Sequence, residues 1–198
     1  MTQGNDDAEI LAAMRAAMER SRGYADFFGW PPDRDLEEAG VLDSLVESMQ
    51  ADGLPFYAAL KSRGRPNDPP DCEGIDNSGA RVAIEITELV AEAAVRAVKQ
   101  GGSQFAWHEW TKKEFLRELA NRIDAKDGRY PKLKGAPYPG GYVIVIHTDE
   151  PLLSRDTVQG YLEGYRLPMP KHVSRALLLL SYDPKIQRCP YFELGFGR

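Results

Sequence analysis

The chain has 198 residues, of which 42% are hydrophobic, and this suits one domain with a real core and at most a helical appendage. The net charge of -5 argues against a uniformly basic nucleic-acid coat but does not exclude a local basic groove. Two cysteines make no disulfide framework and no metal motif. Because the chain shows neither a membrane-spanning run nor a signal peptide, we expect a cytoplasmic protein that does not enter membranes.

The first segment of the chain is predicted to be helical. Apolar residues recur at helical spacing over Asp7–Arg22, and Pro31-Pro32 interrupts the chain after them. We therefore expect residues 1–35 to form an N-terminal helical extension and residues 36–198 to form one compact domain. An extension of this kind is a candidate for homodimer formation or for docking of a protein partner.

Two helices and a β-hairpin are predicted next. Helical patterns cover Leu36–Met49 and Leu54–Ser62, and the two consecutive prolines at the end of Gly64–Pro70 mark a linker. The predicted hairpin has a first arm over Asp71–Ile75 and a second arm, rich in β-branched residues, over Arg81–Val90. Turn-forming residues at 76–79 join the two arms.

The second half of the chain alternates helices and strands. After a break at Gly101-Gly102, a long helix is predicted over Phe105–Lys126 and a buried strand over Tyr142–His147. A short helix then begins at Ser154. The last two predicted elements are a buried strand over Arg175–Tyr182 and an edge-like strand over Pro190–Phe196. Continuous apolar strands of this kind are typical of positions covered on both faces. The order predicts an α/β fold with a mixed central β-sheet flanked by helices.

An acidic residue in the middle of an apolar strand is the main chemical signal. Glu85 shares a strand face with Thr87, roughly 6.6 Å away, and the hairpin should bring Asp71 close to it. Two adjacent carboxylates stay ionised only if a cation neutralises them. Oxygen ligands with room for water suit Mg²⁺ or Mn²⁺, and such an ion can activate water for phosphodiester hydrolysis.

Pro70-Asp71, followed by a turn and then by Glu85-Ile86-Thr87 on a strand, resembles the signature of the PD-(D/E)XK nuclease superfamily. The resemblance covers 36–182 by element order. It implies a restriction-endonuclease-like fold, a mixed sheet flanked by helices and entered by an acidic first helix. It also implies an endonuclease or exonuclease whose Mg²⁺ or Mn²⁺ is held by Asp71, Glu85 and the main-chain carbonyl of Ile86.

The sequence departs from the family pattern at Thr87, because Glu-x-Thr replaces the usual Glu-x-Lys and threonine carries no charge to orient a water. Lys112 and Lys126 both lie on the predicted inward stripe of the helix over 105–126, about 21 Å apart. We favour Lys126, since Lys126 and Tyr130 have a spacing similar to the helix-borne Gln-x-x-x-Tyr of several such nucleases. Without a replacement lysine, the alternative is a catalytically degenerate nuclease-fold protein that acts as a binding or adaptor module.

Two further groups complete the predicted site. Glu47 is the choice for the acid of the first helix, with Glu38 as the alternative. The loop after the long helix combines positive charge for phosphates with rings for exposed bases, and its candidate nucleic-acid-binding residues are Arg129, Tyr130, Lys132 and Lys134.

Each candidate also has a purely structural interpretation. Asp71 suits a turn, Glu85 can form a salt bridge to Arg81 or to a helix lysine, Lys112 can extend along the edge of the core, Lys126 can interact with the helix dipole, and Glu47 can be a solvated helix residue.

Overall fold

The computed structural model describes residues 24–25, 34–100 and 107–197, apart from the side chains of Arg34 and Arg65. The predicted helix over 7–22, the break at Pro31-Pro32 and the break at Gly101-Gly102 lie outside the described residues, as does nearly all of the predicted extension over 1–35. None of the described helices is long and apolar enough to cross a membrane.

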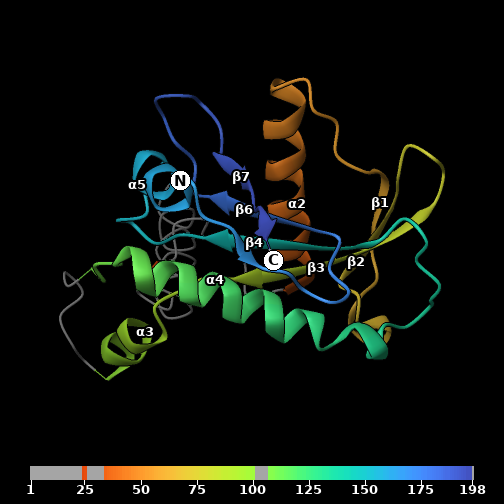
Figure 1. The fold of residues 1–198 in the computed structure, drawn as a ribbon, viewed down its shortest axis with the longest axis horizontal. Coiled ribbons are helices and arrows are strands. Elements are labelled where there is room, and N and C mark those ends of the chain that lie inside the picture. The colour runs from red at the N-terminus through yellow and green to blue at the C-terminus, as the bar shows by residue number, and fades with distance from the viewer. Residues whose placement is uncertain (1–23, 26–33, 101–106, 198) are drawn as a thin grey trace, which may run out of the picture.

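A mixed six-stranded sheet forms the centre of the structure (Figure 1), with the strand order β1-β2-β3-β4-β6-β7. Its strands are β1 (Ala58–Ser62), β2 (Cys72–Ile75), β3 (Arg81–Glu88), β4 (Tyr142–Thr148), β6 (Arg175–Leu180) and β7 (Tyr191–Glu193). The three central strands β3, β4 and β6 run parallel, whereas β1, β2 and β7 pair antiparallel with their neighbours. A small second sheet pairs β5 (Leu167–Pro168) with β8 (Phe196–Gly197).

Helices cover both faces of the central sheet. Successive side chains of β4 point to opposite faces, so Ile144 and Ile146 join one hydrophobic cluster while Val143 and Val145 join the other. The first cluster packs against α4 (Lys112–Asp127), and the second packs against α2 (Arg34–Ala51). The sheet is therefore the middle layer of three, and the predicted α/β fold with a mixed, helix-flanked sheet is confirmed.

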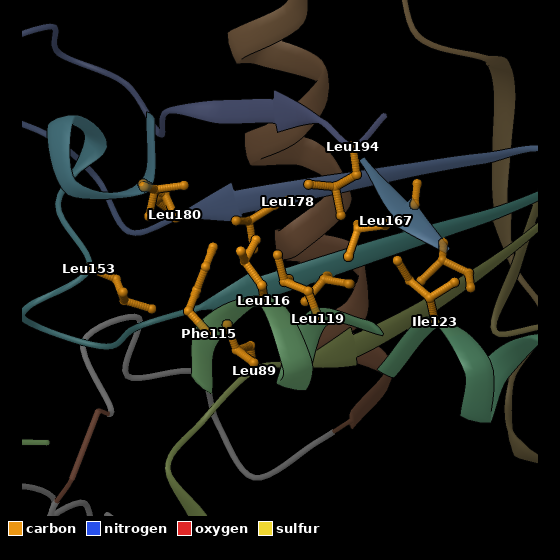
Figure 2. Close-up of a cluster of buried hydrophobic side chains, with 14 of the residues drawn as sticks. Leu89, Phe115, Leu116, Leu119, Ile123, Leu153, Leu167, Leu178, Leu180 and Leu194 are labelled. Carbon is orange, nitrogen blue, oxygen red and sulfur yellow. The ribbon is translucent and has the colours of Figure 1, made fainter. Parts of the chain in front are cut away.

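The packing of α4 determines where its last turn lies. The Thr111 side chain accepts the Glu114 N–H at 3.2 Å and caps the start of the helix. Its buried apolar side chains point toward the sheet (Figure 2) and comprise Phe115, Leu116, Leu119 and Ile123. At helical spacing, the next inward position after Ile123 is Lys126, which the helix therefore carries to the sheet beside β3.

Most of the predicted elements are present. The structure confirms the helix over 36–49 as α2, the hairpin as β2 and β3, and the two buried strands as β4 and β6. The short helix is α5 (Arg155–Leu162), with Ser154 as its N-cap as predicted.

Three predictions of secondary structure differ from the structure. The helix predicted over 54–62 is wrong, because Ala58–Ser62 forms the edge strand β1. The long helix is shorter than predicted within the described residues, since α4 begins at Lys112, and a separate α3 (Glu92–Lys99) precedes it. The predicted last strand is divided between β7 and β8, which pair in different sheets.

Candidate functional site

Asp71 and Glu85 converge at the end of the β2–β3 hairpin, as predicted. Glu85 is fully buried in the middle of β3, and Asp71 is 2% exposed immediately before β2. The Asp71 carboxylate Oδ2 accepts the main-chain N–H of Ile86 at 2.7 Å. The register of the hairpin therefore fixes the two acids side by side.

Pro70 explains why a side chain bonds to Ile86 at this point. The ladder pairs Cys72 with Ile84, so its continuation would place Pro70 opposite Ile86. Proline has no N–H to donate to the Ile86 carbonyl. In an antiparallel pair the N–H and C=O of one residue point to the same neighbour, so the Ile86 carbonyl points to the side of Asp71.

Lys126 joins the two acids from the far end of α4. Its ammonium contacts Glu85 Oε2 directly and lies 3.4 Å from Asp71 Oδ2. Lys126 is itself buried, with 8% of the residue exposed. Of the two lysines predicted to face inward, the structure thus brings Lys126 to the acids.

Arg129 adds a second positive charge to the same cluster. Its guanidinium lies 3.0 Å from Glu85 Oε2 and 3.0 Å from Asp68 Oδ1. Both contacts were missed in the sequence, where Arg129 is assigned to nucleic-acid binding. Its position three residues after Lys126, one turn farther along the chain, is the signal that could have placed it here.

The buried cluster has an unusual charge balance at Glu85. Burial raises the pKa of Glu85, whereas the positive charge of Lys126 opposes the rise. Tyr142, at the start of β4, lies close enough that burial and the charge of Glu85 raise its pKa, while its hydroxyl donates to the Lys126 main-chain carbonyl at 2.9 Å. Among the described residues, the second carboxylate oxygen of Glu85, Oε1, is buried with no hydrogen-bond partner.

The oxygen atoms of this cluster are the kind of donor that a hydrated Mg²⁺ ion uses. The described part of the chain contains no group of three or more His, Cys, Asp or Glu side chains suited to a metal. Mg²⁺ needs fewer side chains than that, since it commonly binds through one or two carboxylates and keeps several waters. The unsatisfied oxygen of Glu85, the carboxylate of Asp71 and the carbonyl of Ile86 are oxygen donors of the required kind.

The acid that α2 contributes to this region is Glu38 and not the first choice, Glu47. Glu38 is buried. The pKa of the neighbouring Cys72 thiol is raised to about 12, first by the burial of the thiol and then by the negative charge of Glu38. Glu47 is exposed, and its charge acts on Cys189. The two acids are nine residues apart, which places them on opposite sides of a helix. Glu38 also shares helical spacing with the buried Val41, Leu42 and Leu45, a signal that the sequence already contains.

The other candidates lie apart from the two acids or at their edge. Lys112 is exposed at the start of α4 and donates to the Gly160 carbonyl at 3.3 Å, so its predicted inward position is wrong. Thr87 is half-buried on β3, two residues after Glu85. Arg81, the alternative partner of Glu85, pairs instead with Glu73 at 2.6 Å.

The basic loop begins at this site and continues along the surface. Lys132 and Lys134 are exposed, and Lys134 also bonds to the carbonyl of Pro66 at 3.2 Å. The Lys134 N–H donates to the Pro69 carbonyl at 2.7 Å, next to the Pro70-Asp71 motif. The loop is thereby attached to the segment that carries Asp71.

A cavity of about 780 Å³ lies elsewhere, beyond the carboxyl ends of β4 and β6. Its lining includes Asp149, Glu150 and Ser181, and it includes none of Asp71, Glu85 and Lys126. The two acids, by contrast, are buried in contact with protein side chains.

In comparisons with family models, curated proteins and solved structures, none matches this chain. A function for this protein is therefore inferred from the geometry of the site.

Proposed function

We propose that this protein is a metal-dependent nuclease that hydrolyses phosphodiester bonds in nucleic acid, as a divergent member of the PD-(D/E)XK superfamily. One observation carries the proposal: Asp71, Glu85 and Lys126, from three separate elements, meet within bonding distance in the interior. The acidic helix α2, the mixed sheet and the flanking α4 support it, because the resemblance implies these elements in this order.

Each residue has a defined role in this proposal. Asp71, Glu85 and the Ile86 carbonyl would hold Mg²⁺ or Mn²⁺, which supplies an activated water and stabilises charge on the phosphoryl oxygens. Lys126 supplies, from the helix, the positive charge that Thr87 lacks. Its ammonium orients the attacking water and stabilises the negative charge that develops on the phosphate.

Arg129 holds the protein part of the site together. Because its guanidinium contacts both Glu85 and Asp68, it links β3 to the segment that precedes Asp71. A buried carboxylate with a raised pKa is stabilised in its ionised form by such a neighbour. Arg129 is therefore a positioning residue whose loss should weaken metal binding as well as cleavage.

The test is cleavage of supercoiled plasmid and of single-stranded DNA in the presence of Mg²⁺ or Mn²⁺. Glu85→Gln and Lys126→Met should each lower the rate by about a hundredfold or more, as the loss of one catalytic electrostatic group does. Lys112→Met on the same helix and Glu47→Gln on α2 are matched controls that should cut like the wild type. No cleavage by the wild type, or undiminished cleavage by Lys126→Met, would contradict the proposal.

A second candidate function is a catalytically degenerate binding or adaptor module on the same fold. The observation that favours it is the contact of Lys126 and Arg129 with Glu85, because these cations neutralise the acid without a metal. This candidate predicts that titration with Mg²⁺ or Mn²⁺ gives no heat of binding by calorimetry. A stoichiometric divalent ion that is lost in Glu85→Gln would exclude it.

A further inference from the structure

A column of three aromatic rings leads away from the acidic cluster, and we call Tyr142, Tyr130 and His172 the ring column. Tyr130 stacks on His172 with the ring centroids 4.3 Å apart and the planes 2° from parallel. Tyr130 also contacts Tyr142, with the ring centroids 5.7 Å apart and the planes tilted by 54°. Tyr142 is the residue whose pKa is raised by burial and by the charge of Glu85.

The ring column is held rigidly by its surroundings. Asp127, the last residue of α4, accepts three consecutive main-chain N–H groups at 3.2, 2.7 and 2.9 Å, from Lys171, His172 and Val173. Tyr130 begins the short helix η2 (Tyr130–Lys132), four residues after Lys126. The end of α4 therefore carries Lys126 and also positions the stacked pair.

The outer part of the ring column is accessible and flanked by positive charge. Tyr130 is 37% exposed and His172 is half-buried. Lys132, two residues after Tyr130, and Lys171, next to His172, are exposed. Exposed rings between basic side chains are the arrangement that binds single-stranded nucleic acid, in which bases stack on rings while phosphates meet the charges.

We infer that the substrate presents an unpaired nucleotide at the ring column, as a single strand or as a single-stranded end, and this rests on the proposed nuclease function. A base inside a duplex has both faces covered by its neighbours and cannot stack on a protein ring. An unpaired base can extend the ring column by one layer at His172. Lys132 and Lys171 then supply positive charge for the adjacent phosphates.

The experiment measures binding without cleavage. Fluorescence anisotropy with the full chain in EDTA compares a labelled oligo-thymidine strand with a blunt duplex of equal length. The wild type should bind the single strand more tightly than the duplex. Tyr130→Ala and His172→Ala should each weaken single-strand binding by about 5- to 150-fold, the range expected for the loss of one stacked base, and should change duplex binding little.

Conservative variants separate stacking from folding. Tyr130→Phe and His172→Phe keep a ring in place and should retain single-strand affinity, whereas Tyr165→Ala removes an exposed tyrosine outside the ring column and should have no effect. Equal or tighter binding of the duplex, no binding of either strand form, or equal losses in both after Tyr130→Ala would overturn the inference. Single-strand binding without cleavage would instead overturn only the proposed nuclease activity, and cleavage of duplex alone would overturn only this inference.

Discussion

Replacing Lys126 by methionine should destabilise the protein strongly, because it removes the ammonium and keeps a long apolar side chain. Glu85 and Asp71, 0% and 2% exposed, would both lose this ammonium, whereas Arg129 would still contact Glu85. Removal of one partner from a buried ion pair typically costs about 3–5 kcal/mol. Since Arg129 remains, we expect the free energy of unfolding to fall by about 3 kcal/mol, the lower end of that range.

A double-mutant cycle separates the charge interaction from the loss of packing. Glu85→Gln removes the buried negative charge, so Glu85→Gln/Lys126→Met should be more stable than Lys126→Met alone, with a coupling energy of about 2–3 kcal/mol. Urea unfolding followed by far-ultraviolet circular dichroism, in EDTA at neutral pH, gives the four free energies. Lys112→Met is the control and should stay within about 0.5 kcal/mol of the wild type. Effects of the two substitutions that simply add would refute the ion pair.

Further outcomes follow from other contacts. Because burial raises the pKa of Glu85, folding favours its protonated form, so the wild type should lose stability relative to Glu85→Gln as the pH rises through the folded pKa. Urea midpoints of both proteins, measured across mildly acidic pH, test this. A constant difference between the two midpoints at every pH would contradict it. Thr111→Ala removes the cap on the Glu114 N–H and should cost about 1 kcal/mol of unfolding free energy, whereas Thr111→Ser should cost far less. Gly140→Ala should lower the melting temperature, since a Cβ there would lie 2.9 and 3.0 Å from the main-chain carbonyl oxygens of residues 80 and 81; an unchanged melting temperature would show that the backbone yields.

The elements that the sequence predicts correctly are those in which apolar residues recur in a regular pattern along the chain. The strands β4 and β6 carry continuous apolar runs, and the hairpin has clear turn residues, so β2, β3, β4 and β6 could be predicted from the sequence. The strand β1 could not, because only Leu60 among its residues is half-buried and the others are exposed, so the sequence shows no alternation there. Its pairing with β2 makes it a strand. Local preference thus gives way to tertiary pairing at the edge of the sheet.

The site was predictable in its acids but not in its cations. The hairpin register alone brings Asp71 to Glu85, whereas the partner of Glu85 depends on how α4 docks. Sequence reasoning demanded a positive charge and could not decide between a metal ion and side chains. Arg129 supplies part of that positive charge, because it lies one turn beyond Lys126, just past the end of α4.

Pro70 stops the pairing of β2 with β3 one rung early, and this leaves a main-chain oxygen of Ile86 unclaimed by the ladder in the interior. If β2 paired with β3 as far as Ile86, the ladder would use this oxygen as a hydrogen-bond acceptor. The ring of a single imino acid therefore converts a structural hydrogen-bond acceptor into one that a ligand can use.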